Sequence, residues 1–365
     1  MSTVTETKSA IEIKKAWQQV QEKSPNIRIR EAAKAVDASE AQLLATMVGE
    51  EAIKLKPEWD AILERLPELG RVMSLTRNDT CILEHKGAFE KVNVFKRKGH
   101  HMATVLGPIE TRVFLKSWHA GFAVKQQKGD RLLTSLQFFD HEGQAITKIY
   151  LEKDSNVEAY ENLVKDFTAE EQSQELEVST YEPEEYALQL NSEALLQDWA
   201  NLKDTHDFFP MLKNHKAHRH DAVSLANGRF TYQVDPNCVQ QILEEASKQK
   251  LPIMIFAGNK GNLQIHQSTV RTIRLLERGH DKKERWINVL DPNFNLHLKM
   301  DLLHDAWVVK KPTKDGVVTS VEFYDANKDL VVQFFGLRKP GIPQNEDWME
   351  LVAKLPALEG GLVEN

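Results

Sequence analysis

Apolar and polar residues alternate with two different periods along this chain. From residue 10 to 66 the apolar positions recur with a helical spacing, interrupted by residues such as Pro25 and Asp37 that suit turns. From residue 70 to 152 they gather in short β-branched and aromatic runs, broken by Gly, Asn and Asp. The second half repeats this order, with helical spacing to about residue 250 and strand patterns to about residue 337. Helices followed by strands, without regular alternation of the two, predict an α+β fold with large antiparallel sheets.

The order returns because the sequence itself is duplicated. Residues 119–140 (HAGFAVKQQKGDRLLTSLQFFD) match residues 304–325 (HDAWVVKKPTKDGVVTSVEFYD) at a fixed offset of 185. A second block matches at an offset of 181, where Met73 falls on Met254. Two matching blocks in the same order indicate a tandem duplication, and a repeat this long is a duplicated domain rather than a solenoid unit.

We therefore predict two homologous domains, residues 1–185 and residues 186–365, each a helical segment followed by a large antiparallel sheet. The acidic stretch 169–186 between them is interpreted as a linker or surface crossing. The sequences KGD at 128–130 and KDG at 314–316 are predicted to be corresponding hairpin tips.

Composition excludes several classes of protein. The 365 residues are 41% hydrophobic and 28% charged, which argues against a disordered or fibrous chain, and the net charge of −7 gives no global attraction for nucleic acid or anionic lipid. Only two cysteines occur, Cys81 and Cys238, with no CxxC, so neither a disulfide framework nor a zinc ribbon is expected. The first residues lack an apolar signal region and no apolar run is long enough to span a membrane. We expect a cytoplasmic protein without membrane insertion.

One histidine lies where an apolar stripe calls for leucine. In the predicted helix 193–216 the stripe runs through Leu195, Trp199, Leu202, position 206 and Phe209. His206 is therefore predicted to be partly buried. The commoner interpretation is a core histidine with a satisfied ring. The functional alternative is an axial ligand to the iron of a planar apolar cofactor, because neutral imidazole binds iron and an apolar wall packs a macrocycle.

Basic residues are the other candidates for ligand binding. Because the chain is acidic overall, it can bind an anionic ligand only where cations are concentrated locally. Arg112 and Phe114 are two residues apart and share one strand face, and the counterpart of Arg112 in the second half is His297. The remaining basic features are the cluster His215, His218, Arg219 and His220, the pair Lys310 and Lys311, and Arg338. The histidine cluster is most simply a solvated basic surface, because no carboxylate or thiolate stands at metal-ligand spacing. No nucleophile elbow, HExxH, P-loop or GxGxxG occurs, so redox chemistry would need an external electron source.

Several long stretches resemble the cytoplasmic hemin-utilisation proteins of the HemS/ChuS/HmuS type, also called hemin-degrading factors. They are GHHMATVLGPIETRVFLKSWHAGFAV (99–124), DTHDFF (204–209), NVLDPNFNLHLK (288–299), AWVVKKPT (306–313) and FFGLRKPG (334–341). The resemblance covers essentially the whole chain, including the duplication. It implies a haem cleft between the two halves.

The resemblance implies roles for individual residues. His206 takes the place of the proximal iron ligand, and Arg112 that of the distal residue at the sixth iron site, which would be catalytic if the protein is an enzyme. The implied packing, propionate and pocket contacts are Phe114, Arg219, Lys311, Gln333, Phe335 and Arg338, with Lys310 as an alternative to Lys311. Family members often have Tyr where this chain has Phe335, so a hydroxyl contact would be missing. His85 resembles a second haem contact of some relatives, although an edge-strand surface histidine is the simpler interpretation.

Three functions compete at this point. The family implies binding of haem b (hemin) for iron acquisition, either for trafficking and storage or for oxidative ring opening with an external reductant and release of iron. The implied partners are haem and a haem-importing ABC transporter, a haem oxygenase or a reductase, without nucleic acid. The third possibility is a regulatory or scaffold protein that binds no haem, which would follow if His206 were an ordinary core residue.

Overall fold

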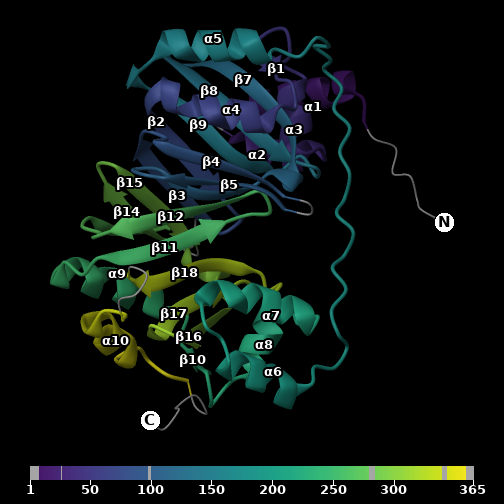
Figure 1. Ribbon diagram of the computed structural model, residues 1–365. Coiled ribbons are helices and arrows are strands. Elements are labelled where there is room, and N and C mark those ends of the chain that lie inside the picture. Colours follow the sequence, from purple (N-terminus) through teal and green to yellow (C-terminus); the bar gives the residue numbers. More distant parts are fainter. Residues whose placement is uncertain (1–7, 26, 98–99, 279–283, 339–342, 359–365) are drawn as a thin grey trace. The chain divides into compact units, whose positions relative to one another are not determined.

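The computed structural model describes residues 8–25, 27–97, 100–278, 284–338 and 343–358. The chain forms two compact units (Figure 1). One contains residues 1–77, 85–182 and 259–263, and the other contains residues 78–84, 183–258 and 264–365. Each unit thus combines most of one predicted half with a short segment of the other. The domain boundary at residues 185 and 186 stays a prediction.

The two units have the same sequence of elements. In the first unit these are α1 (Ala10–Lys23), α2 (Ile29–Val36), α3 (Glu40–Ala45), β1 (Ala52–Lys54), α4 (Trp59–Arg65), β2 (Gly70–Arg77), β4 (Lys91–Arg97), β5 (His100–Leu106), β6 (Glu110–Phe114), β7 (Trp118–Lys128), β8 (Arg131–Asp140), β9 (Ala145–Ser155) and α5 (Val157–Phe167). In the second they are α6 (Ser192–Ala200), α7 (Phe208–Asn214), α8 (Arg219–Leu225), β10 (Thr231–Val234), α9 (Cys238–Gln249), β11 (Ile253–Gly258), β13 (Ile273–Arg278), β14 (Glu284–Asp291), β15 (Phe294–Lys299), β16 (Asp305–Thr313), β17 (Gly316–Tyr324), β18 (Leu330–Gly336) and α10 (Glu346–Ala353). Strands β3 (Cys81–Gly87) and β12 (Asn262–Ser268) contribute residues to both units.

The predicted α+β fold with large antiparallel sheets is confirmed. Pairing joins β1-β7-β8-β9-β2 in the first unit and β10-β16-β17-β18-β11 in the second. Both predicted hairpin tips are present, and each places a glycine at positive φ, Gly129 at 57° and Gly316 at 108°. The matching strand orders are what a duplication requires.

Helices cover both faces of each large sheet, which explains why the central strands are apolar on both sides. In the first unit α4 and α5 pack on one face and α3 on the other. In the second unit α9 and α10 pack on one face and α6 to α8 on the other. Several helices begin where local sequence dictates: Ser39 forms a capping box with Gln42, and Asn156 and Asn191 cap α5 and α6.

The acidic stretch crosses the surface of the first unit, as predicted. It forms neither helix nor strand between residues 169 and 190. Side-chain and backbone hydrogen bonds hold it: Gln174 Nε2 donates to the Val48 carbonyl at 3.0 Å, and Ser179 N donates to the His141 carbonyl at 2.7 Å. These bonds satisfy backbone groups that lie outside any helix or sheet.

Replacing Gly261 by alanine is expected to destabilise the first unit by about 2 kcal/mol, because overpacking a core costs about this much. A Cβ at this position would lie 2.5 Å from Cδ1 of Ile146, a fully buried residue of the core. The check is a double-mutant cycle with Ile146→Ala, in which urea denaturation measures the free energy of unfolding of each variant. The two substitutions should cost less together than the sum of their separate effects, because alanine at 146 removes the clash. Strict additivity would show that the clash is not the cause.

Candidate functional site

His206 does not lie on a continuous helix, so the predicted apolar stripe is wrong. Helix α6 ends at Ala200, and His206 belongs to a separate 3-10 turn, Thr205–Asp207, which leads directly into α7. The helical spacing does not extend across this break. The side chain of His206 is 93% exposed. It is therefore not a core histidine, and its ring is accessible to a ligand.

A neighbouring carboxylate orients this ring. Asp204 Oδ1 lies 2.6 Å from His206 Nδ1 and accepts the backbone N–H of His206 at 2.9 Å. That backbone hydrogen bond is the main cause that holds the pKa of Asp204 below its ordinary value, and the charge of Arg338 adds to it. When Nδ1–H donates to Asp204, the imidazole lone pair is on Nε2, which forms no hydrogen bond within the described residues. A carboxylate behind Nδ1 is the usual support of a metal-binding histidine.

Two cations lie over the ring of Phe208, two residues after His206. The ring centroid is 4.6 Å from Lys311 Nζ and 5.0 Å from the guanidinium carbon of Arg219. Trp199 packs edge-on against the same ring at 4.6 Å between centroids. Such cation–π contacts are worth about 1 kcal/mol each when partly desolvated. They anchor the turn that carries His206 to strand β16 and helix α8.

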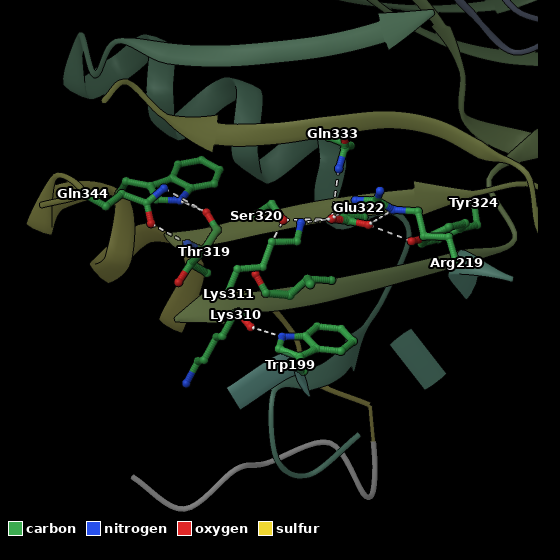
Figure 2. A network of polar contacts seen from close by, with 12 residues as sticks. Trp199, Arg219, Lys310, Lys311, Thr319, Ser320, Glu322, Tyr324, Gln333 and Gln344 are labelled. Atoms are coloured by element: carbon green, nitrogen blue, oxygen red, sulfur yellow. Dashed lines mark hydrogen bonds and ion pairs between the residues drawn. The ribbon is translucent and has the colours of Figure 1, made fainter. Parts of the chain in front are cut away.

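Both cations share one fully buried carboxylate, Glu322 on β17 (Figure 2). Arg219 donates to it in a bidentate pair, from Nε and Nη2, both at 2.8 Å. Lys311 Nζ and Gln333 Nε2 each donate to Oε1 at 2.9 Å. The hydroxyl groups of Ser320 and Tyr324 complete the shell at 3.0 and 2.7 Å. Three of the predicted site residues therefore meet at one carboxylate.

Burial and charge oppose each other in this cluster. Burial would raise the pKa of Glu322, but Arg219 and Lys311 outweigh it and hold that pKa well below the ordinary value. Burial would likewise lower the pKa of Arg219, but Glu322 raises it above the ordinary value. For Lys311 burial dominates and lowers the pKa to about 8, with the charge of Glu322 in partial opposition. Near neutral pH the cluster thus holds two cations and one anion, a net charge of +1.

The other predicted residues of the second unit lie nearby in the fold. Phe335 on β18 is paired with Ser320 in the sheet register, and its ring lies 5.0 Å from Phe256 and 5.9 Å from Lys311 Nζ. Arg338 follows the same strand, with Nη2 4.0 Å from Asp315 Oδ2. Both side chains are largely buried. The second unit therefore brings together aromatic surface and three cations on the sheet face beside the His206 turn.

Arg112 and Phe114 lie on β6 in the first unit. Along β6 burial alternates, so that Arg112 and Phe114 share the more exposed face, as predicted. Arg112 Nη2 lies 3.0 Å from Glu110 Oε1, and its side chain is half-buried. The predicted haem cleft between the halves stays a prediction.

Two interpretations of histidines are wrong. His85 is buried, at 4% exposure, so it is not a surface histidine. The cluster around Arg219 is not a solvated basic surface, because His220 is buried with Nε2 3.0 Å from Asp305 Oδ2, and His215 Nε2 lies 2.7 Å from Asp198 Oδ2. These histidines are bound to structural carboxylates.

Lys310 and Lys311 are neighbours on β16, so their side chains point to opposite faces of the sheet. Lys311 points into the buried cluster and is 3% exposed, whereas Lys310 Nζ lies 5.9 Å from the ring of Tyr232. The geometry therefore favours Lys311 as the member of the pair within the candidate site.

Sequence reasoning missed Glu322, Asp204 and Phe208. A signal for Glu322 was present, because it is an acidic residue within the apolar run Val321–Tyr324 of a strand that is buried on both sides. The DTHDFF motif contains the other two, but their roles depend on the turn that the motif forms.

Comparisons with known proteins identify the family of the chain. The model of the family "Haemin-degrading HemS.ChuX domain" matches residues 37–167 and 216–355, one segment in each predicted half. The chain therefore belongs to the haemin-degrading HemS/ChuX domain family.

Three relatives illustrate the range of the family. The crystal structure of holo-PhuS, a heme-binding protein from Pseudomonas aeruginosa, has a TM-score of 0.90 at 40% identity, covering 96% of this chain and 100% of PhuS. The heme degrading enzyme ChuS of Escherichia coli O157:H7 has a TM-score of 0.87 at 28% identity, covering 95% of this chain and 100% of ChuS. The hemin transport protein HmuS of Yersinia pestis is 32% identical over 341 residues, 92% of this chain and 95% of HmuS. Among the described residues, no helix is long and apolar enough to cross a membrane.

Proposed function

We propose that this chain binds haem b as a cargo or substrate, with His206 as the proximal iron ligand. The observation that carries the proposal is the exposed His206 ring, held through Nδ1 by Asp204 and anchored beside Lys311 and Arg219 through Phe208. Haem is a flat apolar disc with two carboxylates, so it needs an open imidazole, aromatic surface and local cations. The second unit supplies all three kinds of group.

The proposed contacts follow from this chemistry. Arg219, Lys311 and Arg338 are the proposed propionate-side cations, and Phe335 and Gln333 line the same face. Arg112 is proposed as the distal residue, with Phe114 beside the porphyrin. Their shared exposed face on β6 supports this assignment.

Haem trafficking or storage during iron acquisition in the cytoplasm is the proposed role. It is supported by PhuS, which is named a heme-binding protein, and by the hemin transport protein HmuS. The proposed partners are haem and a haem-importing ABC transporter, a haem oxygenase or a reductase, which would deliver, receive or reduce the bound haem.

A second candidate function is haem degradation, which the similarity to ChuS favours. Arg112 would then be a catalytic residue that donates a hydrogen bond at the sixth iron site. The test adds ascorbate to the haem complex in the presence of catalase and follows the visible spectrum. Loss of the Soret band with a biliverdin-like product and free iron supports an enzyme. A stable spectrum supports a carrier.

Replacing His206 by alanine is expected to weaken hemin binding by about 100-fold, because loss of an iron ligand should cost at least as much as loss of a second-shell partner. The measurement is a hemin titration of the wild type and His206→Ala, followed by absorbance. The control is His215→Ala, since His215 is bound to Asp198. Wild-type spectra and affinity in His206→Ala would refute the ligand assignment, and absence of saturable binding in the wild type would favour a scaffold that binds no haem.

A further inference from the structure

We propose that Glu322 is a positioning residue that makes the site selective for tetrapyrroles with free carboxylates. The inference rests on the proposed function and extends it to ligand selectivity. Glu322 is fully buried, so it acts through the groups it holds, Arg219, Lys311 and Gln333, rather than by contact with the ligand.

Glu322 receives more hydrogen bonds than a carboxylate accepts in good geometry. Six donor atoms on five residues lie within 3.0 Å of its two oxygens, and of these only the Ser320 hydroxyl has a second acceptor, the Val309 carbonyl at 3.5 Å, among the hydrogen bonds of the described residues. A carboxylate has about four lone-pair sites. Four of the six converge on Oε1: Arg219 Nη2, Lys311 Nζ, Gln333 Nε2 and Ser320 Oγ. This surplus of donors and the net charge of +1 match one additional carboxylate group.

The carboxylate is also what allows the two cations to stay together. Arg219 and Lys311 both lie within 2.9 Å of the same oxygen of Glu322. Out of water, two cations this close repel each other, and a buried lysine beside an arginine tends to lose its proton. The charged and titratable groups around this point are Arg219 on α8, Lys311 on β16, and Glu322 and Tyr324 on β17. Glu322 therefore preserves two charged donor groups that would otherwise separate or neutralise.

The first unit shows that the fold itself does not require this charge. At the offset of 185 the positions of Glu322 and Lys311 hold Gln137 and Gln126. Gln137 is also buried, and its Nε2 donates to Ser135 Oγ at 3.1 Å. A neutral glutamine thus occupies the same strand position in a folded repeat. In the second unit the charged residues Glu322 and Lys311 lie on the sheet face beside the His206 turn. This is where the proposed ligand would need a cation.

The test compares hemin with hemin dimethyl ester, in which both carboxylates are blocked, by equilibrium titration. The wild type is expected to prefer hemin by about tenfold or more, since charge-assisted hydrogen bonds to a carboxylate are worth about this much. In Glu322→Gln the preference should fall to about twofold, while affinity for the ester stays within about twofold of the wild type, because iron ligation and aromatic packing remain. Glu322→Asp should restore part of the preference. The matched control is Gln137→Leu, at the same strand position in the first unit, which should keep the full preference.

A preference for hemin that is unchanged or increased in folded Glu322→Gln overturns the inference and leaves haem binding intact. An equal loss of affinity for hemin and ester also overturns it, because that is the result of general damage to the site. If Glu322→Gln does not fold, the same titrations are made with Glu322→Asp. Its preference for hemin over the ester must then fall several-fold while its affinity for the ester stays constant. Otherwise the inference is wrong. If the wild type binds neither compound saturably, the proposed function fails as well.

Discussion

Replacing Glu322 by alanine is expected to lower the free energy of unfolding by about 4 kcal/mol, the usual cost of removing one partner from a buried ion pair. The substitution leaves Arg219 and Lys311 near each other and without their shared carboxylate. It also removes the acceptor of the Tyr324 hydroxyl and the Gln333 amide. Each buried donor left unsatisfied adds its desolvation cost.

Urea denaturation followed by circular dichroism measures this effect. Gln137→Ala is the matched control, because it truncates the equivalent buried side chain of the first unit without stranding a charge. It should cost about 1–2 kcal/mol. The double variant Glu322→Ala with Lys311→Met should recover part of the loss, because one stranded charge is removed. A cost below about 1 kcal/mol for Glu322→Ala would mean that water already solvates the two cations.

The elements that could be predicted are those set by local signals. The apolar runs predict the positions of the strands, and the KGD and KDG turns predict the hairpins that join them. Strands β7, β8, β16 and β17 therefore lie where the sequence pattern predicts them. The duplication could be predicted because residues 119–140 still match residues 304–325, and the structure shows the same order of elements in both halves. It also identified matched positions at which the halves differ, such as Arg112 and its counterpart His297.

The error at His206 shows where a periodic pattern fails. The stripe assumes that one helix continues from residue 193 to 216, but Asp204 caps a new turn by accepting the backbone N–H of His206. A capping residue next to a histidine is a local signal that competes with helical spacing, and here it determines the exposure of the ring.

Glu322 could not be assigned from sequence, because its partners come from different elements. In the sheet register it lies between Trp307 and Gln333, and Arg219 reaches it from a helix 103 residues away. Such a pairing depends on which strands adjoin and which helix covers them. An acidic residue in a doubly buried strand indicates a partner but does not identify it.

Acidification is expected to destabilise the second unit through His266. Burial, the largest cause, lowers the pKa of this imidazole to about 4, and its ring stacks on Phe294 with centroids 3.7 Å apart. In the unfolded chain a histidine has a pKa of about 6.5. Between these two values the unfolded state binds more protons than the folded state, so stability falls as the pH drops from about 6.5 towards 4. The expected contribution is about 3 kcal/mol, since each pKa unit corresponds to about 1.4 kcal/mol.

The measurement compares the free energy of unfolding of the wild type and His266→Gln at several pH values between 7.5 and 4. At pH 7.5 the imidazole is neutral in both states, so the difference between the proteins there reports packing alone. As the pH falls, the wild type should lose about 3 kcal/mol more than the variant, because glutamine does not titrate. Parallel curves would show that His266 keeps an ordinary affinity for protons in the folded state. The acid sensitivity would then have to come from carboxylates such as Glu322, whose lowered pKa makes its contribution disappear only at much lower pH.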